Sequence, residues 1–184
     1  MLKGKKVILR TIRESDLDEF FSLDTDISER GEYDAYFIHS EPRFKSDFRE
    51  TGFWKEDFGT MLVTSIDGRT LGIISYFKGL KYAEGFEIGY KIFKREDRGK
   101  GYMTEALKLF TSFMFANRPI ARMSVNMLTE NIASRKLAEK CGYKHEGIMR
   151  KAVFCRGRYY DLNLMSILRE ECTPLPELLE SLNQ

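Results

Sequence analysis

Cysteine and histidine are scarce in this sequence, which has three cysteines and two histidines among its 184 residues. The cysteines are odd in number and widely spaced, which argues against a disulfide framework. No CxxC or HxxxH pattern occurs, which argues against a zinc site. We therefore expect neither a metal nor a structural disulfide. The residues concerned are Cys141, Cys155, Cys172, His39 and His145.

Long apolar runs are also missing. No segment approaches the ~20 apolar residues needed to span a bilayer, and the N-terminus MLKGKKVILR lacks the apolar stretch of a secretory signal. A net charge of only +2 does not indicate a general nucleic-acid binder. We expect a cytoplasmic protein that binds neither membranes nor nucleic acid. With no internal repeat or linker, one domain is expected over 1–184, with 170–184 as a C-terminal tail.

Charge is unevenly distributed along the chain. Nine acidic residues lie between Arg13 and Asp34, against two basic ones. Five basic residues lie between Lys91 and Lys100, against two acidic ones. The first segment is suited to attract a cation and the second an anion. The alternative interpretation is that both are ordinary solvated surface.

Hydrophobic periodicity predicts a mixed α/β sheet covered by helices. Strands are expected at 5–12, 60–66, 70–77, 84–93, 120–128, 143–155 and 159–168, and helices from Ser15, at 102–116 and at 130–143. Ser15 and Asp18 are expected to cap the first helix. Asp67-Gly68 predicts a hairpin turn, and another turn is expected near 80–84. The segment 25–58 is predicted to hold loops with one or two short helices.

The segment KREDRGKGYMTEA, residues 94–106, has Gly99 and Gly101 among basic residues directly before a predicted helix. Glycine lets backbone N–H groups approach a ligand without an intervening Cβ atom, and free N–H groups at a helix N-terminus attract anions. A phosphate or pyrophosphate site is therefore predicted. The nucleotide P-loop and the dinucleotide fingerprint both fail on spacing, since Gly101 follows Lys100 and Thr104 stands where a third glycine is required. A tight turn capped by glycines is the alternative.

Four segments carry a resemblance to a known family: EIGYKI, RGKGYMTEAL, NIASRKLAEKCGYKHEGIMR and GRYYDLNLMSIL. In this order and spacing, and over nearly its whole length, the chain resembles the GNAT superfamily of N-acetyltransferases, in particular the RimJ/RimL-type ribosomal-protein N-terminal acetyltransferases. The resemblance implies acetyl-CoA (coenzyme A) as co-substrate. It also implies the GNAT fold, an α/β (α+β) architecture. Its mixed, mostly antiparallel twisted sheet has about seven strands flanked by helices, with a V-shaped splay between central strands.

The resemblance implies that backbone amides of the glycine loop hold the pyrophosphate of coenzyme A. These amides belong to Arg98, Gly99, Lys100, Gly101, Tyr102 and Met103. The family usually has Gln or Arg where this chain has Glu96, so Arg95 or Arg98 would have to substitute for that side chain. The preceding strand would pair its backbone at Ile92 and Phe93 with the pantetheine arm, while both side chains are expected in the core.

Asn131 and Ser134 match the N-x-x-S of the family's second motif. The resemblance implies that Asn131 hydrogen-bonds the pantetheine amides and that Ser134 lies near the sulfur. Many members carry a tyrosine general acid four residues beyond this serine, but here, as commonly in the RimJ/RimL-type group, it is absent and Ala138 stands there. Ser134 is then the candidate to protonate or hydrogen-bond the departing thiolate. From the residues alone, helix capping is the alternative.

An amine attacks a thioester only when neutral, so the enzyme needs a group that accepts a proton. Glu87 is the candidate general base, since the family often has one on this strand; a solvent-facing or ion-paired glutamate is the alternative. Asp161 is expected either to line the acceptor site or to hold the hairpin backbone. Tyr90, Tyr143 and Trp54 could line an acceptor channel, although strand aromatics are more typical of a core.

The predicted function is acetyl-CoA-dependent acetyl transfer to a primary amine by direct attack in a ternary complex. The acceptor candidates are a ribosomal-protein N-terminal amine and a small amine, such as a polyamine or an aminoglycoside. An acidic rim that includes Asp24, Asp26 and Glu29 would favour a cationic acceptor. A non-catalytic acyl-CoA sensor of the same fold is the alternative from another class. Relatives are often dimers, so a homodimer is a further expectation.

Overall fold

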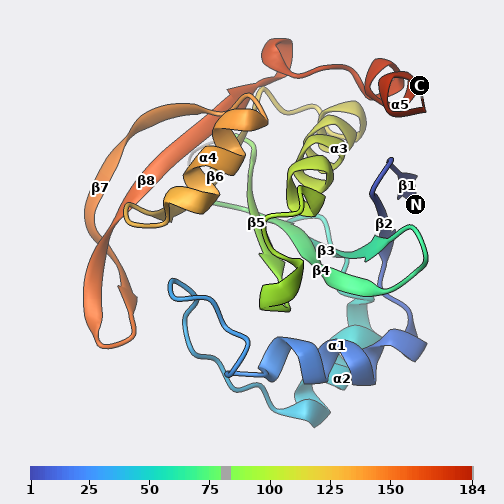
Figure 1. Ribbon diagram of the computed structural model, residues 1–184, viewed down its shortest axis with the longest axis vertical. Coiled ribbons are helices and arrows are strands. Elements are labelled where there is room, and N and C mark those ends of the chain that lie inside the picture. The colour runs from blue at the N-terminus through green and yellow to red at the C-terminus, as the bar shows by residue number, and fades with distance from the viewer. Residues whose placement is uncertain (80–83, 184) are drawn as a thin grey trace.

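The computed structural model describes residues 1–79 and 84–183, through which one eight-stranded sheet runs (Figure 1). The spatial order is β1-β2-β3-β4-β5-β6-β8-β7. The predicted mixed, mostly antiparallel sheet is confirmed, and the two-residue β1 at one edge supplies the strand beyond the expected seven or so. The strands are β1 (Leu2–Lys3), β2 (Val7–Thr11), β3 (Phe58–Ser65), β4 (Thr70–Phe77), β5 (Phe86–Ile92), β6 (Arg122–Leu128), β7 (Lys144–Cys155) and β8 (Arg158–Leu168).

The α-helices of the described residues cover both faces of the sheet (Figure 1). They are α1 (Leu17–Thr25), α2 (Glu41–Thr51), α3 (Tyr102–Asn117), α4 (Ile132–Lys140) and α5 (Leu175–Asn183). The first two pack through Phe20 and Phe44 onto one face, against Leu62 of β3. The others belong to the larger core on the opposite face, where α5 packs against α3.

The side chains of β5 alternate between these two faces, as expected for a strand. Ile88, Tyr90 and Ile92 belong to the core that contains α3. Lys91 points to the opposite face and contacts Asp24 of α1. This strand therefore offers side chains to both layers of the molecule.

β5 and β6 form the one parallel pair of the described sheet, because α3 connects them as a crossover. Their pairing is limited to Phe86 with Met123 and Glu87 with Ser124. Beyond Glu87 the two strands separate, while β5 remains paired with β4 as far as Ile92. The predicted splay between central strands is confirmed.

The start of α1 differs from the prediction. Ser15 lies inside a short 3-10 helix that precedes α1, and Asp16 rather than Asp18 makes the reciprocal bond, since its Oδ2 accepts from the Arg13 N–H at 2.7 Å. The reason is tertiary: the guanidinium of Arg10 on β2 holds the same carboxylate at 2.6 and 2.8 Å. This ion pair fixes the entry to the helix, and no Ser15 cap forms.

The remaining expectations largely agree with the structure. α2 is a short helix within 25–58, and it ends at Gly52, whose φ of 60° is left-handed. The β7–β8 hairpin turns at Arg156 and Gly157, inside the predicted CRGR segment. The turn expected near 80–84 lies, apart from Glu84, outside the described residues. Among residues 1–79 and 84–183, no helix has the length and apolar character required to cross a bilayer.

Candidate active site

The glycine loop connects β5 to α3. A short 3-10 helix, Arg95–Asp97, follows the strand, and Gly99 and Gly101 come next with φ angles of 76° and 83°. These left-handed conformations favour glycine, because a Cβ atom would be strained there. Gly101 is the N-cap of α3, so the N–H groups of the first helical turn have no acceptor within the helix. The predicted bare backbone at a helix N-terminus agrees with the structure.

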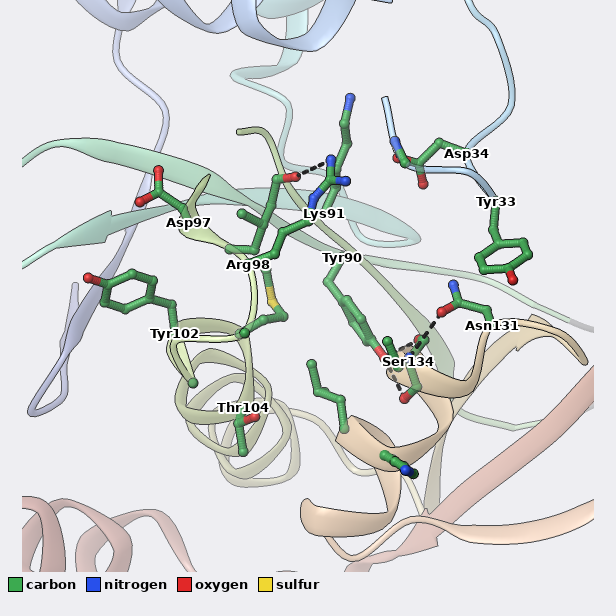
Figure 2. A pocket seen from close by; sticks show the side chains of 18 of the residues that line it. Tyr33, Asp34, Tyr90, Lys91, Asp97, Arg98, Tyr102, Thr104, Asn131 and Ser134 are labelled. Atoms are coloured by element: carbon green, nitrogen blue, oxygen red, sulfur yellow. Dashed lines mark hydrogen bonds between the residues drawn. The ribbon is translucent and has the colours of Figure 1, made fainter. Parts of the chain in front are cut away.

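A cavity of about 500 Å³, called cavity 1, opens at this helix N-terminus (Figure 2). Most of the predicted cofactor-binding residues line it. They are Ile92, Arg98, Gly99, Gly101, Tyr102, Met103, Asn131 and Ser134. Residues that lie up to 42 positions apart in the sequence thus meet around one space, as the resemblance implied.

Cavity 1 lies beside the part of β5 that is no longer paired with β6. Tyr90 and Ile92 belong to the face that packs against α3, whereas Lys91 belongs to the opposite face, yet all three line the cavity. Ser134 of α4 lies on one wall, and Tyr33 lies on another (Figure 2). Cavity 1 therefore borders α3 and, through Gly31 to Asp34, the segment that follows α1.

Three of the predicted residues do not line cavity 1: Phe93, Lys100 and Glu87. Phe93 is 1% exposed and packs against Phe20, which agrees with the expected core side chain, but its N–H donates to the Leu71 oxygen at 3.0 Å and is not free for a ligand. The Lys100 ammonium lies 3.6 Å from the Asp97 carboxylate.

Glu87 lies where β5 and β6 separate, opposite Ser124. Its position on β5 faces the same side as Lys91, and its side chain is half-buried with Asn126 of β6 as a polar neighbour. Burial raises the pKa of this carboxyl above its ordinary value, and Asn126 offsets only part of that rise. The side chain is thus only partly exposed to solvent, and a half-buried carboxyl with a raised pKa is chemically suited to accept a proton.

Asn131 and Ser134 form the start of α4. The Asn131 Oδ1 accepts from the Ser134 N–H at 3.0 Å, so the capping interpretation is confirmed. Ser134 Oγ lies 2.6 Å from the Tyr90 hydroxyl oxygen on the wall of cavity 1 (Figure 2). Only the amide oxygen of Asn131 is used by the cap, so its amide N–H groups remain as donors. Capping and ligand contact are compatible at this residue.

Arg95 and Arg98, the possible substitutes for the family's Gln or Arg, both donate to main-chain oxygens, and Arg98 also lines cavity 1. The Arg98 guanidinium donates to the main-chain oxygen of Glu29 at 2.6 Å and to that of Ile92 at 3.4 Å. The Arg95 guanidinium donates to the Ser28 oxygen at 3.1 Å. Both groups are engaged by main-chain carbonyls and tie the segment after α1 to the glycine loop.

The segment 31–34 also lines cavity 1, whereas the sequence predicted it only as part of the acidic stretch on the acceptor side. The β7–β8 turn holds this segment in position, because Arg156 donates to the Gly31 oxygen at 2.7 Å and to the Asp34 oxygen at 3.0 Å. These partners are 125 and 122 positions apart. No local sequence pattern contains such a contact.

A second cavity of about 510 Å³, called cavity 2, lies between α1, α2 and the sheet. Its walls combine phenylalanine rings with both basic and acidic side chains. The residues with ionisable side chains are Asp24, His39, Arg43, Asp47, Glu50 and Lys55. Asp24 links the two cavities, since its carboxylate lies 3.2 Å from the ammonium of Lys91 in cavity 1 and 3.7 Å from His39.

The acidic rim predicted from the sequence is in part engaged inside the protein. Asp24 is paired with Lys91, and Glu29 accepts a hydrogen bond from the Arg95 N–H at 2.9 Å. The carboxylates of α2 that face cavity 2, Asp47 and Glu50, were not predicted. They could have been predicted from their spacing of three positions, because this spacing puts both side chains on one side of a helix.

Asp161 has a structural role. Its Oδ1 accepts from the Lys151 N–H at 2.8 Å. Lys151 has a φ of 49°, and it lies where the register of β7 shifts between Met149 and Val153. The carboxylate thereby stabilises an irregular strand, and Asp161 lines neither cavity 1 nor cavity 2. The hairpin interpretation is confirmed.

Of the aromatic residues considered for a channel, Tyr90 lines cavity 1 and the other two are core residues. Tyr143 is 3% exposed, and its hydroxyl oxygen lies 2.7 Å from that of Thr111. Trp54 packs edge-on against Tyr76. The core interpretation therefore holds for two of the three.

The three cysteines are free thiols. Burial raises the pKa of Cys141 to about 12, so this group stays protonated near neutral pH. Within residues 1–79 and 84–183, no group of three or more His, Cys, Asp or Glu side chains is arranged to hold a metal ion.

A model of the family described as "Acetyltransferase (GNAT) domain" matches residues 6–144, which is more than half of the chain. The match includes β5, the glycine loop, α3 and α4, which together form cavity 1. The chain therefore belongs to the GNAT acetyltransferase family. The prediction of an N-acetyltransferase is confirmed.

Individual relatives agree with this assignment. The Bacillus subtilis (strain 168) protein named "Probable N-acetyltransferase YjcK" is 28% identical over 179 residues, which cover 93% of this chain and 98% of that protein. A spermidine N-acetyltransferase from Vibrio cholerae in complex with CoA and spermine has a TM-score of 0.72 at 19% identity, over 90% of this chain and 96% of the other. RimL, a ribosomal-protein alpha-N-acetyltransferase in complex with coenzyme A, has a TM-score of 0.76 at 17% identity, over 90% and 95%. The expected GNAT fold is confirmed.

Proposed function

We propose that this enzyme transfers the acetyl group of acetyl-CoA to a primary amine by direct attack within a ternary complex. The observation that carries the proposal is the course of cavity 1, from the N-terminus of α3 along the part of β5 that is unpaired with β6 to Tyr90 and Ser134. This course has an anion site at one end and two hydroxyl groups at the other. Coenzyme A has the same order of groups, with a pyrophosphate at one end and a thiol at the other.

The walls of cavity 1 suit coenzyme A in charge and in shape. The ammonium-bearing residues Lys136 and Lys140 of α4 line the cavity and add positive charge to that of the helix N-terminus. A Cβ atom built at Gly99 would meet nothing within 4 Å, so the backbone there is open to a ligand. Asn131 offers amide donors for the pantetheine arm. The loop from Arg98 to Met103 supplies the main-chain N–H groups.

The chemistry divides among residues of this chain. Acetyl-CoA supplies a thioester, and as the amine attacks, a carbon–nitrogen bond forms and the carbon–sulfur bond breaks, its electron pair leaving with sulfur. Glu87 accepts the amine proton directly or through water, since its raised pKa brings it closer to neutrality. Backbone N–H groups near Ile92 stabilise the oxyanion, and Ser134 hydrogen-bonds the departing sulfur. No cysteine lines cavity 1 within the described residues, which supports direct attack.

A protein N-terminal amine is the acceptor that we propose, entering from cavity 2 as in an enzyme of RimJ/RimL type. Cavity 2 has three carboxylates, Asp24, Asp47 and Glu50, against the basic Arg43 and Lys55. This near balance suits the single ammonium group of a peptide better than a polyamine with several positive charges. The phenylalanine rings of the same cavity suit the first side chains of a peptide.

A polyamine is the second candidate acceptor. Asp47 and Glu50 project from one side of α2 into cavity 2 and could bind two ammonium groups of an extended polycation. The counter-charge of Arg43 lies 3.9 Å from Asp47, and 83% of the Arg43 side chain is exposed, so it can swing into solvent. The fold is shared with spermidine N-acetyltransferases.

The deciding measurement is the release of CoA thiol from acetyl-CoA across a panel of amines. The panel holds peptides with ribosomal-protein N-termini that begin with Ser or Ala, spermidine, aminoglycosides and free amino acids. The proposal expects turnover with the peptides. Turnover confined to spermidine or the aminoglycosides would establish a small-amine enzyme instead.

Calorimetric titration with coenzyme A separates the enzyme from the sensor. Tight binding of coenzyme A together with no turnover of any amine would support a sensor. If the protein did not bind coenzyme A, the proposed function would be wrong. Initial rates measured while both substrates are varied then test the ternary complex. Intersecting double-reciprocal lines support direct attack, and parallel lines contradict it.

A further inference from the structure

The hydroxyl groups of Tyr90 and Ser134 meet on the wall of cavity 1. Their oxygen atoms are 2.6 Å apart, and the Tyr90 hydroxyl oxygen lies 3.4 Å from the main-chain oxygen of Ser134. Tyr90 comes from β5 and Ser134 from the first turn of α4, which follows β6 (Figure 2). The contact therefore joins β5 to the start of α4 on the wall of cavity 1.

A pair of hydroxyl groups has two hydrogens, and their mutual bond uses one of them. When Tyr90 donates to Ser134 Oγ, the Ser134 hydrogen is free for another acceptor. The main-chain N–H of Ser134 already donates to Asn131 at 3.0 Å, which holds this turn of the helix in place. Because both side chains line cavity 1, an acceptor in the cavity is within reach of the free hydrogen.

The helical position one turn after Ser134 cannot supply a hydroxyl group. It is Ala138, which is 0% exposed and belongs to the core. Tyr90 brings a phenol to the same wall from the sheet instead of from the helix. Its ring packs against the core that contains α3, so the direction of its hydroxyl is fixed by packing.

Burial raises the pKa of Tyr90 to about 12, although the bond with Ser134 acts in the opposite direction. A phenol with this pKa stays neutral near physiological pH. It is a poor acid toward a thiolate, because a thiol such as that of cysteine has an ordinary pKa of only about 8.5. The neutral phenol nevertheless remains a hydrogen-bond donor. Orientation, rather than proton transfer, is the role that this chemistry allows.

We propose that Tyr90 is a positioning residue that donates to Ser134 Oγ and thereby directs the Ser134 hydrogen toward the sulfur of bound coenzyme A. The inference rests on the proposed function, in which cavity 1 holds coenzyme A with its sulfur beside Ser134. A donor aimed at sulfur stabilises the charge that develops there as the carbon–sulfur bond breaks. Without the phenol, the Ser134 hydroxyl loses the partner that fixes its rotation.

The first test titrates the thiol of bound coenzyme A, followed by the ultraviolet absorbance of the thiolate. Ser134→Ala removes the donor, and Tyr90→Phe removes the group that orients it. We expect the pKa of the bound thiol to be higher by about one unit in each variant than in the unmodified protein. The basic residues Lys91, Lys136 and Lys140 of cavity 1 are the same in all three proteins, so the difference reports the hydroxyl groups.

Tyr143→Phe is the matched control. It also removes a buried tyrosine hydroxyl, which lies 2.7 Å from the Thr111 hydroxyl oxygen, but it lies outside cavity 1. Its bound thiol is expected to titrate as in the unmodified protein. A loss of stability common to Tyr143→Phe and Tyr90→Phe is thereby separated from the effect on sulfur.

The second test is a double-mutant cycle in turnover. Tyr90→Phe and Ser134→Ala should each lower kcat roughly tenfold to a hundredfold, the usual effect of losing a hydrogen bond to a charged group. The double variant should be no slower than Ser134→Ala, because Tyr90 acts through Ser134.

The inference is wrong if the thiol bound to Tyr90→Phe has the same pKa as in the unmodified protein, or a pKa shifted no more than in Tyr143→Phe. It is also wrong if the losses of kcat in the two single variants add up in the double variant. Calorimetry distinguishes this failure from that of the proposed function. If the unmodified protein binds no coenzyme A, both fail. If it binds coenzyme A and Tyr90→Phe leaves the titration unchanged, only the role of Tyr90 fails.

Discussion

Asp97 and Arg69 form a two-pronged ion pair, with the carboxylate oxygens 2.6 and 2.9 Å from the two guanidinium nitrogens. Asp97 is 2% exposed and directly precedes the glycine loop, whereas Arg69 directly precedes β4 in the β3–β4 hairpin. Lys100 adds a longer contact at 3.6 Å. The pair ties the start of the glycine loop to the sheet, which holds the anion site in a fixed position.

Arg69→Ala is expected to lower the free energy of unfolding by about 1–3 kcal/mol, because the buried Asp97 carboxylate loses its main partner. Looser anchoring of the glycine loop should also weaken coenzyme A binding about tenfold. Denaturant unfolding and calorimetry measure the two effects. Arg122→Ala is the control, since Arg122 is equally exposed (44%) but pairs with the half-exposed Glu146. Equal losses in both variants would contradict the anchoring role.

Acid should weaken the same ion pair. The Arg69 guanidinium holds the pKa of Asp97 below its ordinary value of 3.8. A lowered pKa in the folded state means that the stabilisation is complete above that value and is lost as pH falls below it. We expect the unmodified protein to lose stability in acid more steeply than Arg69→Ala. Denaturant unfolding at a series of pH values checks this, and parallel curves for the two proteins would count against it.

The glycine loop could be predicted from the sequence because its physics is local. Gly99 and Gly101 need left-handed φ angles and lie directly before a helix, and both facts belong to one short segment. The capping role of Asn131 could also be predicted from the sequence, since a cap involves residues three positions apart. The order of strands and helices followed from periodicity within single segments.

The features that could not be predicted from the sequence depend on contacts between segments that are far apart in the chain. The Ser15 cap failed because Arg10 of the neighbouring strand holds Asp16. Tyr90 and Ser134 are 44 positions apart, and their bond exists only because β5 and α4 lie on either side of one gap. Arg156 reaches the wall of cavity 1 from 122 positions away. Such contacts are products of the complete fold, and no local pattern encodes them.

Gly101→Ala tests the need for a bare backbone at the anion site. Its φ of 83° should cost an alanine about 1–2 kcal/mol of stability. The added Cβ would also lie 3.3 Å from the Lys6 ammonium. We expect a Kd for coenzyme A about tenfold higher, by calorimetry. Gly52→Ala shares a left-handed φ, 60°, outside cavity 1. It should lose similar stability but keep its affinity, and a matching loss of affinity would contradict the site.

Glu87→Gln separates catalysis from stability. Removing the proposed base should lower kcat/KM roughly a hundredfold to ten-thousandfold. Burial raises the pKa of Glu87 in the folded protein, so its ionisation opposes folding as pH rises above the ordinary value of 4.5. The glutamine protein should therefore be more stable than the unmodified one at neutral pH, by denaturant unfolding. Glu139→Gln, at the exposed Arg135 pair on α4, should change neither quantity. An active, stabilised Glu87→Gln protein would remove Glu87 as base.

The acceptor side is tested by neutralising Asp47 and Glu50 together, as Asp47→Asn with Glu50→Gln. The KM for the peptide amine should rise about fivefold to tenfold, because cavity 2 loses two negative charges, while the Kd for coenzyme A stays constant because neither residue lines cavity 1. Asp18→Asn removes an 85% exposed carboxylate outside both cavities and should alter neither constant. Asp24→Asn should raise both, since Asp24 also contacts Lys91 in cavity 1. A KM unchanged in the double variant would mean that the amine does not approach through cavity 2.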